Sequence, residues 1–229
     1  MNTEKMPKLT LILAESEIER IPANIQHHPQ IKSFTKGRNK PATDLLLDAS
    51  YHHAAMKKLP ESNRRGRPDI VHRCTLHALD SWINQRSLLQ FFIHTRDDYV
   101  IWLNPKTRLP RQYHRFVGLM EQLFKKKKIE TSEDILLTVE KKDLKTVLDD
   151  QIGEPFLLWE QGKKKSLFDV ITSMKDDPLT IVIGGFPHGD FHQASQLIEH
   201  KFAVEQDSFT ASYLLAKSIC TFEFVNFNH

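Results

Sequence analysis

Residues 180–190 read Thr-Ile-Val-Ile-Gly-Gly-Phe-Pro-His-Gly-Asp, an apolar, β-branched run that continues directly into a glycine-rich segment. The first half predicts a buried strand and the second half predicts a tight turn. Glycines directly after a strand allow a ligand to approach the backbone closely. The segment is neither GxGxxG nor a P-loop, because its second glycine is misplaced and no GK[ST] follows. Two interpretations therefore stay open: an ordinary turn, and a loop that holds a cofactor through backbone groups.

Strand and helix patterns alternate on both sides of this segment. Further strands are predicted at 9–13, 88–93, 99–103, 135–139 and 156–159. Helices are predicted over 50–59, 68–84, from Pro110 onward, 167–174 and 208–222, with Pro68 at a first helical position. The two strands around Arg96-Asp97-Asp98 predict a hairpin. Alternating strands and helices indicate an α/β fold.

Composition excludes several classes of protein. The chain has 229 residues, of which 40% are hydrophobic and 27% charged, and this apolar fraction is enough to build a core. No apolar run approaches the roughly 20 residues that span a bilayer, and no apolar signal core follows the first residues. Cys74 and Cys220 stand far apart and form no disulfide framework. The net charge of +3 is modest, so the distribution of charge is more informative than its sum.

Arginine is concentrated in residues 64–69 and 106–115, and both segments precede predicted helix starts. Helix N-termini bind anions readily, so this arrangement predicts a phosphate-binding surface. Arg111 and Arg115 are four residues apart, so we expect them on one helix face with Arg108 in the loop ahead of them. The alternative is a solvated surface whose arginines form ion pairs with Asp97, Asp98 or Glu121.

Two smaller patterns have competing interpretations. Asp69, in the first turn of a predicted helix, suits the helix dipole; it is also two residues from Arg67, which it could orient, and it could accept a proton. His188, Asp190 and His192 alternate as metal ligands in an extended segment would. Neither a cysteine cluster nor an HExxH motif accompanies them, so no metal site is predicted.

Several segments together resemble the Nep1 (Emg1) family of ribosome-biogenesis methyltransferases. They are 48–53 (DASYHH), 67–72 (RPDIVH), 104–111 (NPKTRLPR), 115–123 (RFVGLMEQL) and 183–189 (IGGFPHG), in the family's order. The resemblance implies one SPOUT-type methyltransferase domain over residues 1–229, an α/β fold with a C-terminal trefoil knot. It also implies a family-specific β-hairpin insertion around residues 86–115, and a homodimer.

The resemblance further implies S-adenosylmethionine-dependent methylation of N1 of a pseudouridine in small-subunit ribosomal RNA, with a role in small-subunit biogenesis. By analogy Arg67 and Asp69 are catalytic, and the RNA-binding residues are Arg67, Asp69, Arg108, Arg111 and Arg115. The cofactor-binding residues implied in the same way are Leu158, Gly184, Gly189, Val204, Glu205, Gln206, Asp207, Ser208 and Phe209. The implied partners are the ribosomal RNA, a second copy of the chain and ribosomal proteins, without a membrane. The implied location is the cytoplasm, or the nucleolus in a eukaryote.

One segment departs from the family pattern. Family members carry a loop like S-[IL]-S-x-[YF]-P-L before the last helix, whereas the matching stretch here is Val204-Glu205-Gln206-Asp207-Ser208-Phe209. If backbone groups hold the cofactor, the loop tolerates this change, and its acidic residues favour a sulfonium. If side chains hold the cofactor, affinity is weakened or lost. The alternative function is therefore a non-catalytic, RNA-binding ribosome assembly factor; a metal hydrolase would rest on the His188 cluster alone.

Overall fold

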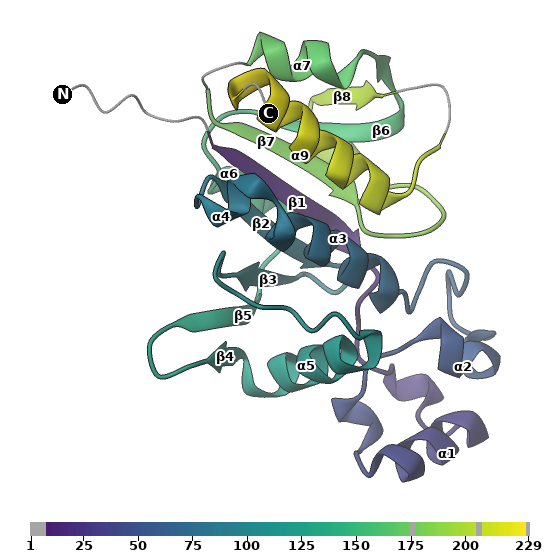
Figure 1. Cartoon of the computed structure of the whole chain (residues 1–229). Helices are drawn as coiled ribbons and strands as arrows, with labels where there is room; N and C mark the ends of the chain where they lie inside the picture. The colour runs from purple at the N-terminus through teal and green to yellow at the C-terminus, as the bar shows by residue number, and fades with distance from the viewer. Residues whose placement is uncertain (1–7, 175–176, 205–207, 228–229) are drawn as a thin grey trace.

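A mixed sheet with the strand order β4-β5-β3-β2-β1-β7-β6-β8 forms the centre of the computed structural model, which describes residues 8–174, 177–204 and 208–227 (Figure 1). The strands are β1 (Leu9–Ser16), β2 (Leu89–Thr95), β3 (Tyr99–Leu103), β4 (Lys128–Glu130), β5 (Ile135–Lys141), β6 (Pro155–Lys164), β7 (Leu179–Gly184) and β8 (His200–Ala203). Strands β2, β1, β7, β6 and β8 are parallel, whereas β3, β5 and β4 join in antiparallel pairs. The predicted α/β fold is confirmed.

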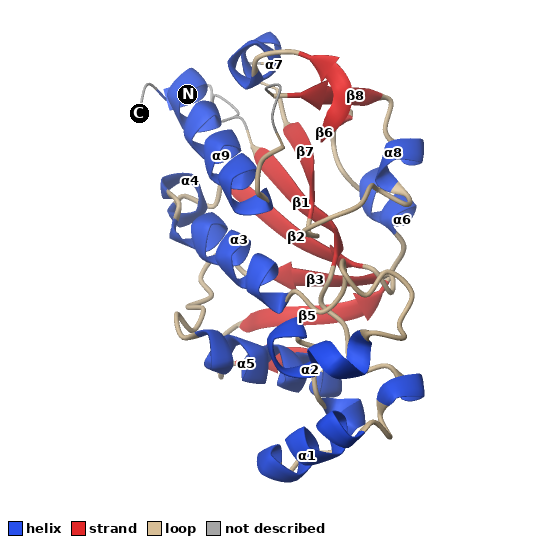
Figure 2. Ribbon diagram, turned by 90° about the vertical axis from the view of Figure 1, so that its right-hand side faces the viewer, coloured by secondary structure: helices blue, strands red, loops and turns tan. Residues whose placement is uncertain are grey.

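The alternation of side chains along β1 divides the core into two layers. Leu9, Leu11 and Leu13 lie in the larger hydrophobic cluster with α3, α5, α7 and α9, whereas Ile12 and Ala14 lie in the smaller cluster with α6 and α8. Figure 2 shows these helices on opposite sides of the sheet. The helices of the larger layer are α3 (Pro68–Asp80), α4 (Trp82–Gln85), α5 (Tyr113–Lys126), α7 (Leu167–Ser173) and α9 (Ala211–Phe227), and those of the smaller are α6 (Leu144–Asp149) and α8 (Ala194–Leu197). No helix in the described ranges is long and apolar enough to span a bilayer.

A third, smaller cluster lies beyond the end of β1. It packs α1 (Pro29–Arg38) and α2 (Ala49–Met56) around Ile31, Leu45 and Leu47, together with two short 3-10 turns, η1 (Ala23–Ile25) and η2 (Ala42–Asp44). Helix α2 begins where the Asp48 carboxylate accepts a hydrogen bond from the Ser50 N–H at 2.8 Å, a standard N-cap. Figure 1 shows this unit next to the first turn of α3, so it borders the arginine segments.

Most predicted elements are confirmed, and three differences follow from local chemistry. The hairpin β2–β3 and the position of Pro68 at the start of α3 are as expected. The long helix predicted to Asn84 is instead two helices, because the Ser81 backbone is extended and its hydroxyl caps α4. Helix α1 was not predicted, because Ile31 is its only buried residue and gives no apolar period. Strand β8, which pairs with β6, was also not predicted.

Candidate functional site

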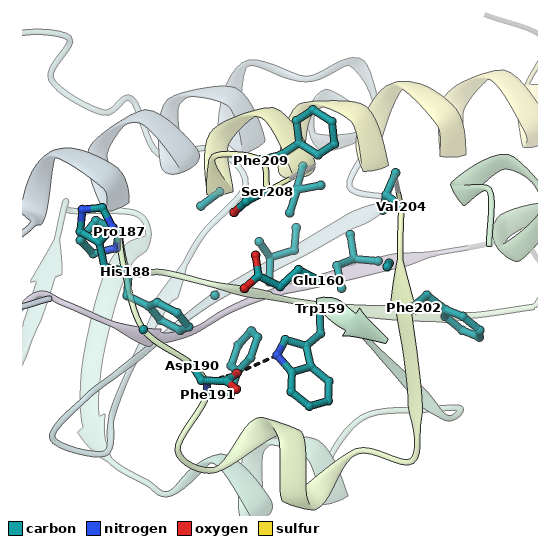
Figure 3. A pocket seen from close by; sticks show the side chains of 18 residues that line it. Trp159, Glu160, Pro187, His188, Asp190, Phe191, Phe202, Val204, Ser208 and Phe209 are labelled. Carbon is teal, nitrogen blue, oxygen red and sulfur yellow. Dashed lines mark hydrogen bonds between the residues drawn. The ribbon is translucent and has the colours of Figure 1, made fainter. Parts of the chain in front are cut away.

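A pocket of about 250 Å³ opens where the carboxyl end of β7 and the middle of β6 meet the glycine-rich loop, the end of β8 and the start of α9 (Figure 3). Ligands of parallel α/β sheets commonly bind at this end of the strands. Six of the predicted cofactor residues line it: Leu158, Gly184, Gly189, Val204, Ser208 and Phe209. The other three, Glu205, Gln206 and Asp207, lie outside the described residues.

At two positions of the loop 184–191, the backbone geometry explains why the residue is glycine. A side chain at Gly185 would place its Cβ 2.2 Å from the Ser16 Oγ and 2.7 Å from the Ser16 Cα, so β7 and β1 approach too closely for any larger residue. Gly189 has a φ of +88°, a conformation that glycine adopts at no steric cost. The loop is therefore a fixed turn whose backbone forms one wall of the pocket.

Two carboxylates, Glu160 and Asp190, line the pocket. The Asp190 carboxylate accepts hydrogen bonds from the Trp159 Nε1 at 2.7 Å and from the Gln161 Nε2 at 2.9 Å, which joins the loop to β6. Glu160 is exposed, and Figure 3 shows its carboxylate pointing into the pocket between apolar side chains. Sequence reasoning missed these residues, although Trp159 and Glu160 directly follow the buried part of a predicted strand.

Two of the three side chains considered as metal ligands contact other residues instead. The Asp190 carboxylate is occupied as described, and the His192 Nε2 lies 2.9 Å from the Glu61 Oε1. His188 lines the pocket. Within the ranges that the structure describes, no three His, Cys, Asp or Glu side chains are grouped to hold a metal ion.

Arg67 and Asp69 form a bidentate ion pair at the start of α3. The Arg67 Nε and Nη2 donate to the two carboxylate oxygens of Asp69, each at 2.8 Å, and both side chains are about one third exposed. Burial alone would raise the pKa of Asp69, but the hydrogen bonds and charge of Arg67 outweigh it and lower that pKa below its usual value. Asp69 is therefore ionised at neutral pH, and it holds the guanidinium in a fixed plane.

The expected shared face of Arg111 and Arg115 is wrong. Helix α5 begins at Tyr113 rather than Pro110, because the Pro110 carbonyl is bonded to the His72 Nε2 at 2.8 Å instead of a helical N–H. Arg111 therefore lies ahead of the helix and forms an ion pair with Asp80 at 3.1 Å, not with any of the acidic residues considered from the sequence. All three arginines of this segment are exposed, and among the described residues Arg108 and Arg115 form no ion pair.

The first arginine segment is also different from the expected phosphate-binding surface. Arg64 and Arg65 are largely buried, and they pair with Glu15 and Glu17 in the first case and with Glu19 in the second. Of this segment, only Arg67 presents a partly exposed guanidinium. An arginine run is normally solvated, so the sequence contained no signal for these buried pairs.

Comparisons with known proteins agree on one family. The model of the EMG1/NEP1 methyltransferase family matches residues 11–223. The ribosomal RNA small subunit methyltransferase Nep1 of Thermococcus kodakarensis is 46% identical over 186 residues, which cover 80% of this chain and 84% of that protein. Nep1 of Thermococcus onnurineus is 42% identical over 218 residues, covering 94% and 98%. The crystal structure of Archaeoglobus fulgidus Nep1 bound to S-adenosylhomocysteine matches with a TM-score of 0.84 at 34% identity, over 96% of this chain and 98% of that one.

Proposed function

Since the chain belongs to the EMG1/NEP1 methyltransferase family, we propose that it transfers a methyl group from S-adenosylmethionine to small-subunit ribosomal RNA. The observation that carries this proposal is the pocket, which collects lining residues from three segments far apart in the sequence, around 158, 184–191 and 203–214. The similar Archaeoglobus fulgidus protein binds the demethylated cofactor, S-adenosylhomocysteine.

The residues present fit this cofactor. S-adenosylmethionine, when bound, supplies an electrophilic methyl group on a sulfonium sulfur. The pocket offers apolar side chains for a flat adenine, including Leu158 and Phe209, and a backbone wall at Gly189 where a larger residue would be strained. Glu160 places a negative charge in the same pocket, which suits the positively charged methionine part of the molecule. We assign Leu158, Gly184, Gly189 and residues 204–209 to cofactor binding.

The acceptor we propose is N1 of a pseudouridine. This nitrogen carries a weakly acidic proton, so negative charge develops on the ring oxygens as the proton leaves. A guanidinium aimed at those oxygens stabilises that charge, and Arg67 is suited to the role because Asp69 fixes its plane. An ionised carboxylate with a lowered pKa is a weak proton acceptor, which supports a positioning role for Asp69 over a role as general base.

The RNA surface we propose consists of Arg67, Asp69, Arg108, Arg111 and Arg115. Exposed arginines recognise phosphates bidentately and stack on unpaired bases. Arg108 and Arg115 suit these contacts because they are exposed and, among the described residues, form no ion pair. Arg111 has to exchange its exposed pair with Asp80 for a phosphate, which costs little because both side chains are more than half exposed.

We also propose the C-terminal trefoil knot, the homodimer and a cytoplasmic location. The strand order supports the knot, because the chain leaves β6, places β7 between β6 and β1, and returns past β6 to form β8. The loops after β7 and β8 then line the same pocket. The hairpin β2–β3 and its following loop form the insertion around residues 86–115.

Methyl transfer from tritiated cofactor to a short ribosomal RNA hairpin tests this function. Matched hairpins carry pseudouridine or uridine at the target position, and we expect transfer only to pseudouridine. Arg108→Ala is expected to reduce transfer by weakening hairpin binding. Hairpin binding without any transfer would favour the second candidate, an RNA-binding assembly factor, which the altered stretch from Val204 to Phe209 already favours.

A further inference from the structure

Arg64 is the buried cation next to the pocket. Its side chain is 3% exposed, and the Nε and Nη2 atoms donate to Glu17 at 2.7 Å and to Glu15 at 3.0 Å. The third nitrogen, Nη1, donates to the backbone carbonyl of Asp190, and the guanidinium lies 3.6 Å from the centre of the Phe186 ring. One side chain therefore joins the end of β1 to two points of the loop 184–191.

The carboxylate of Glu15 continues this connection along the same loop. It accepts hydrogen bonds from the backbone N–H groups of His192, Gln193 and Ala194 at 2.7, 2.9 and 3.0 Å. Arg64 neutralises this carboxylate through Oε2, the oxygen that also accepts the His192 N–H. The loop is consequently fixed from Phe186 to Ala194 by one buried pair of charges.

The free energy of folding gives little reason to bury the ion pairs of Arg64 with Glu15 and Glu17. A buried ion pair often contributes no more than a well-packed apolar pair, because desolvation offsets the attraction. What Arg64 provides is geometry: a flat, three-directional donor that also stacks on a ring, which no other side chain combines. Both of its loop contacts, Phe186 and Asp190, line the pocket.

We propose that Arg64 is a positioning residue for the cofactor, which it serves by holding the loop 184–191 in the conformation that forms the pocket wall. This inference rests on the proposed function, because it concerns the affinity for S-adenosylmethionine. The guanidinium of Arg67, which we propose for RNA contact, is held by two hydrogen bonds to Asp69 rather than by Arg64. Loss of Arg64 should therefore affect cofactor binding and leave hairpin binding nearly unchanged.

Arg65 offers a matched control. It is 11% exposed and forms a bidentate pair with Glu19 at 2.8 and 2.6 Å, but it has no contact with the loop among the described residues. The full-length variants Arg64→Lys and Arg65→Lys each keep the positive charge and lose the planar fork. Calorimetric titration with S-adenosylhomocysteine gives Kd, steady-state transfer gives KM and kcat, and thermal unfolding gives Tm.

For Arg64→Lys we expect Kd and the KM for S-adenosylmethionine to rise about tenfold or more, because a lysine cannot hold Glu15, Glu17 and the Asp190 carbonyl together. The kcat at saturating cofactor and the hairpin Kd are expected to stay within about threefold of the wild type. Arg65→Lys is expected to lower Tm about as much as Arg64→Lys does, because each variant weakens a buried ion pair. Its cofactor Kd is expected to change less than about twofold.

Equal cofactor Kd values for Arg64→Lys and wild type, or equal losses for both lysine variants, would overturn the inference. If Arg64→Lys does not fold, Arg64→Met combined with Glu15→Gln removes one charge of each sign, and the same tenfold loss is expected of it. Wild-type protein that binds no S-adenosylhomocysteine would instead overturn the proposed function, and this inference with it.

Discussion

The variant Asp69→Asn tests whether the fixed orientation of the Arg67 guanidinium, and not only its positive charge, contributes to methyl transfer. The amide keeps the size of the carboxylate but loses its charge, so Arg67 becomes free to leave the plane in which two 2.8 Å hydrogen bonds hold it. We expect the methyl-transfer kcat to fall about tenfold to a hundredfold, because a donor that is no longer aligned stabilises developing charge less well. The side chain lies at the surface of α3, so the fold should survive the change.

The structure sets the size of the accompanying changes. Two opposite charges about 4 Å apart attract by about 4 kcal/mol at an effective dielectric constant of 20. Because the Arg67 and Asp69 side chains are 33% and 32% exposed, water removes most of this attraction, and exposed pairs contribute roughly 0.2–1 kcal/mol. The expected fall in Tm is then no more than about 2–4 °C for a chain of this size. RNA affinity should rise slightly, because one negative charge is removed from the RNA-facing surface. The slope of the logarithm of the binding constant against the logarithm of the salt concentration should become steeper by roughly 0.7–0.9.

Asp80→Asn is the matched control, since it also removes a carboxylate from an arginine, here Arg111 at 3.1 Å. Both variants gain the same net charge. The assay measures single-turnover transfer to the pseudouridine hairpin at saturating cofactor, together with hairpin Kd at several salt concentrations. The reasoning fails if Asp69→Asn transfers methyl groups as fast as Asp80→Asn, or if its main defect is weaker RNA binding.

Three further predictions concern the pocket and the core. Gly185→Ala should abolish folding or cofactor binding, because the new Cβ would lie 2.7 Å from the Cα of Ser16 in β1. Gly118→Ala, whose Cβ would meet no atom within 4 Å, should instead raise the free energy of unfolding by roughly 0.5–1 kcal/mol in chemical denaturation. Equal stabilities of the two variants would contradict this. Burial lowers the pKa of His52 to about 4, so the unfolded chain binds more protons below pH 6.5 and the unfolding free energy should fall by up to about 3 kcal/mol between pH 6.5 and 4. His52→Asn should reduce that fall and the exposed neighbour His53→Asn should not; identical pH profiles would refute the assignment. Glu160→Gln should weaken S-adenosylmethionine about two- to fivefold in calorimetry, but not 5′-methylthioadenosine, which lacks the cationic arm; equal losses would exclude charge recognition.

The elements that could be predicted from the sequence are those with a local cause. Short, continuous runs of apolar residues marked β1 and β7, and a proline suited to the first helical position marked the start of α3. The glycine loop was visible because its shape is a property of the backbone. By contrast, α6 has only two buried residues and β4 only three residues in all, so neither carried a usable period.

The arginines show why the site could be predicted only in part. Which guanidinium is solvated depends on the acidic side chains that the fold brings next to it, and Glu17 lies 47 residues from Arg64 in the chain. The same limit applies to the Trp159–Asp190 hydrogen bond across the pocket, whose partners are 31 residues apart. Segment composition predicted a cationic surface, but pairing across the fold decides which arginines belong to it.

The position of β1 in the sheet has a consequence for the synthesis of the protein on the ribosome. This strand is translated before both of its neighbours in the sheet, which are far along the chain: Leu9 pairs with Leu89 on one side and with Leu179 on the other. At 5–20 residues per second, roughly 10 to 30 seconds separate translation of β1 from that of β7. During this time one edge of a strand that is entirely buried in the complete fold has no partner, and such edges are prone to aggregation. The edge of β1 that faces β7 can therefore be covered by its native partner only after about 170 further residues have been translated.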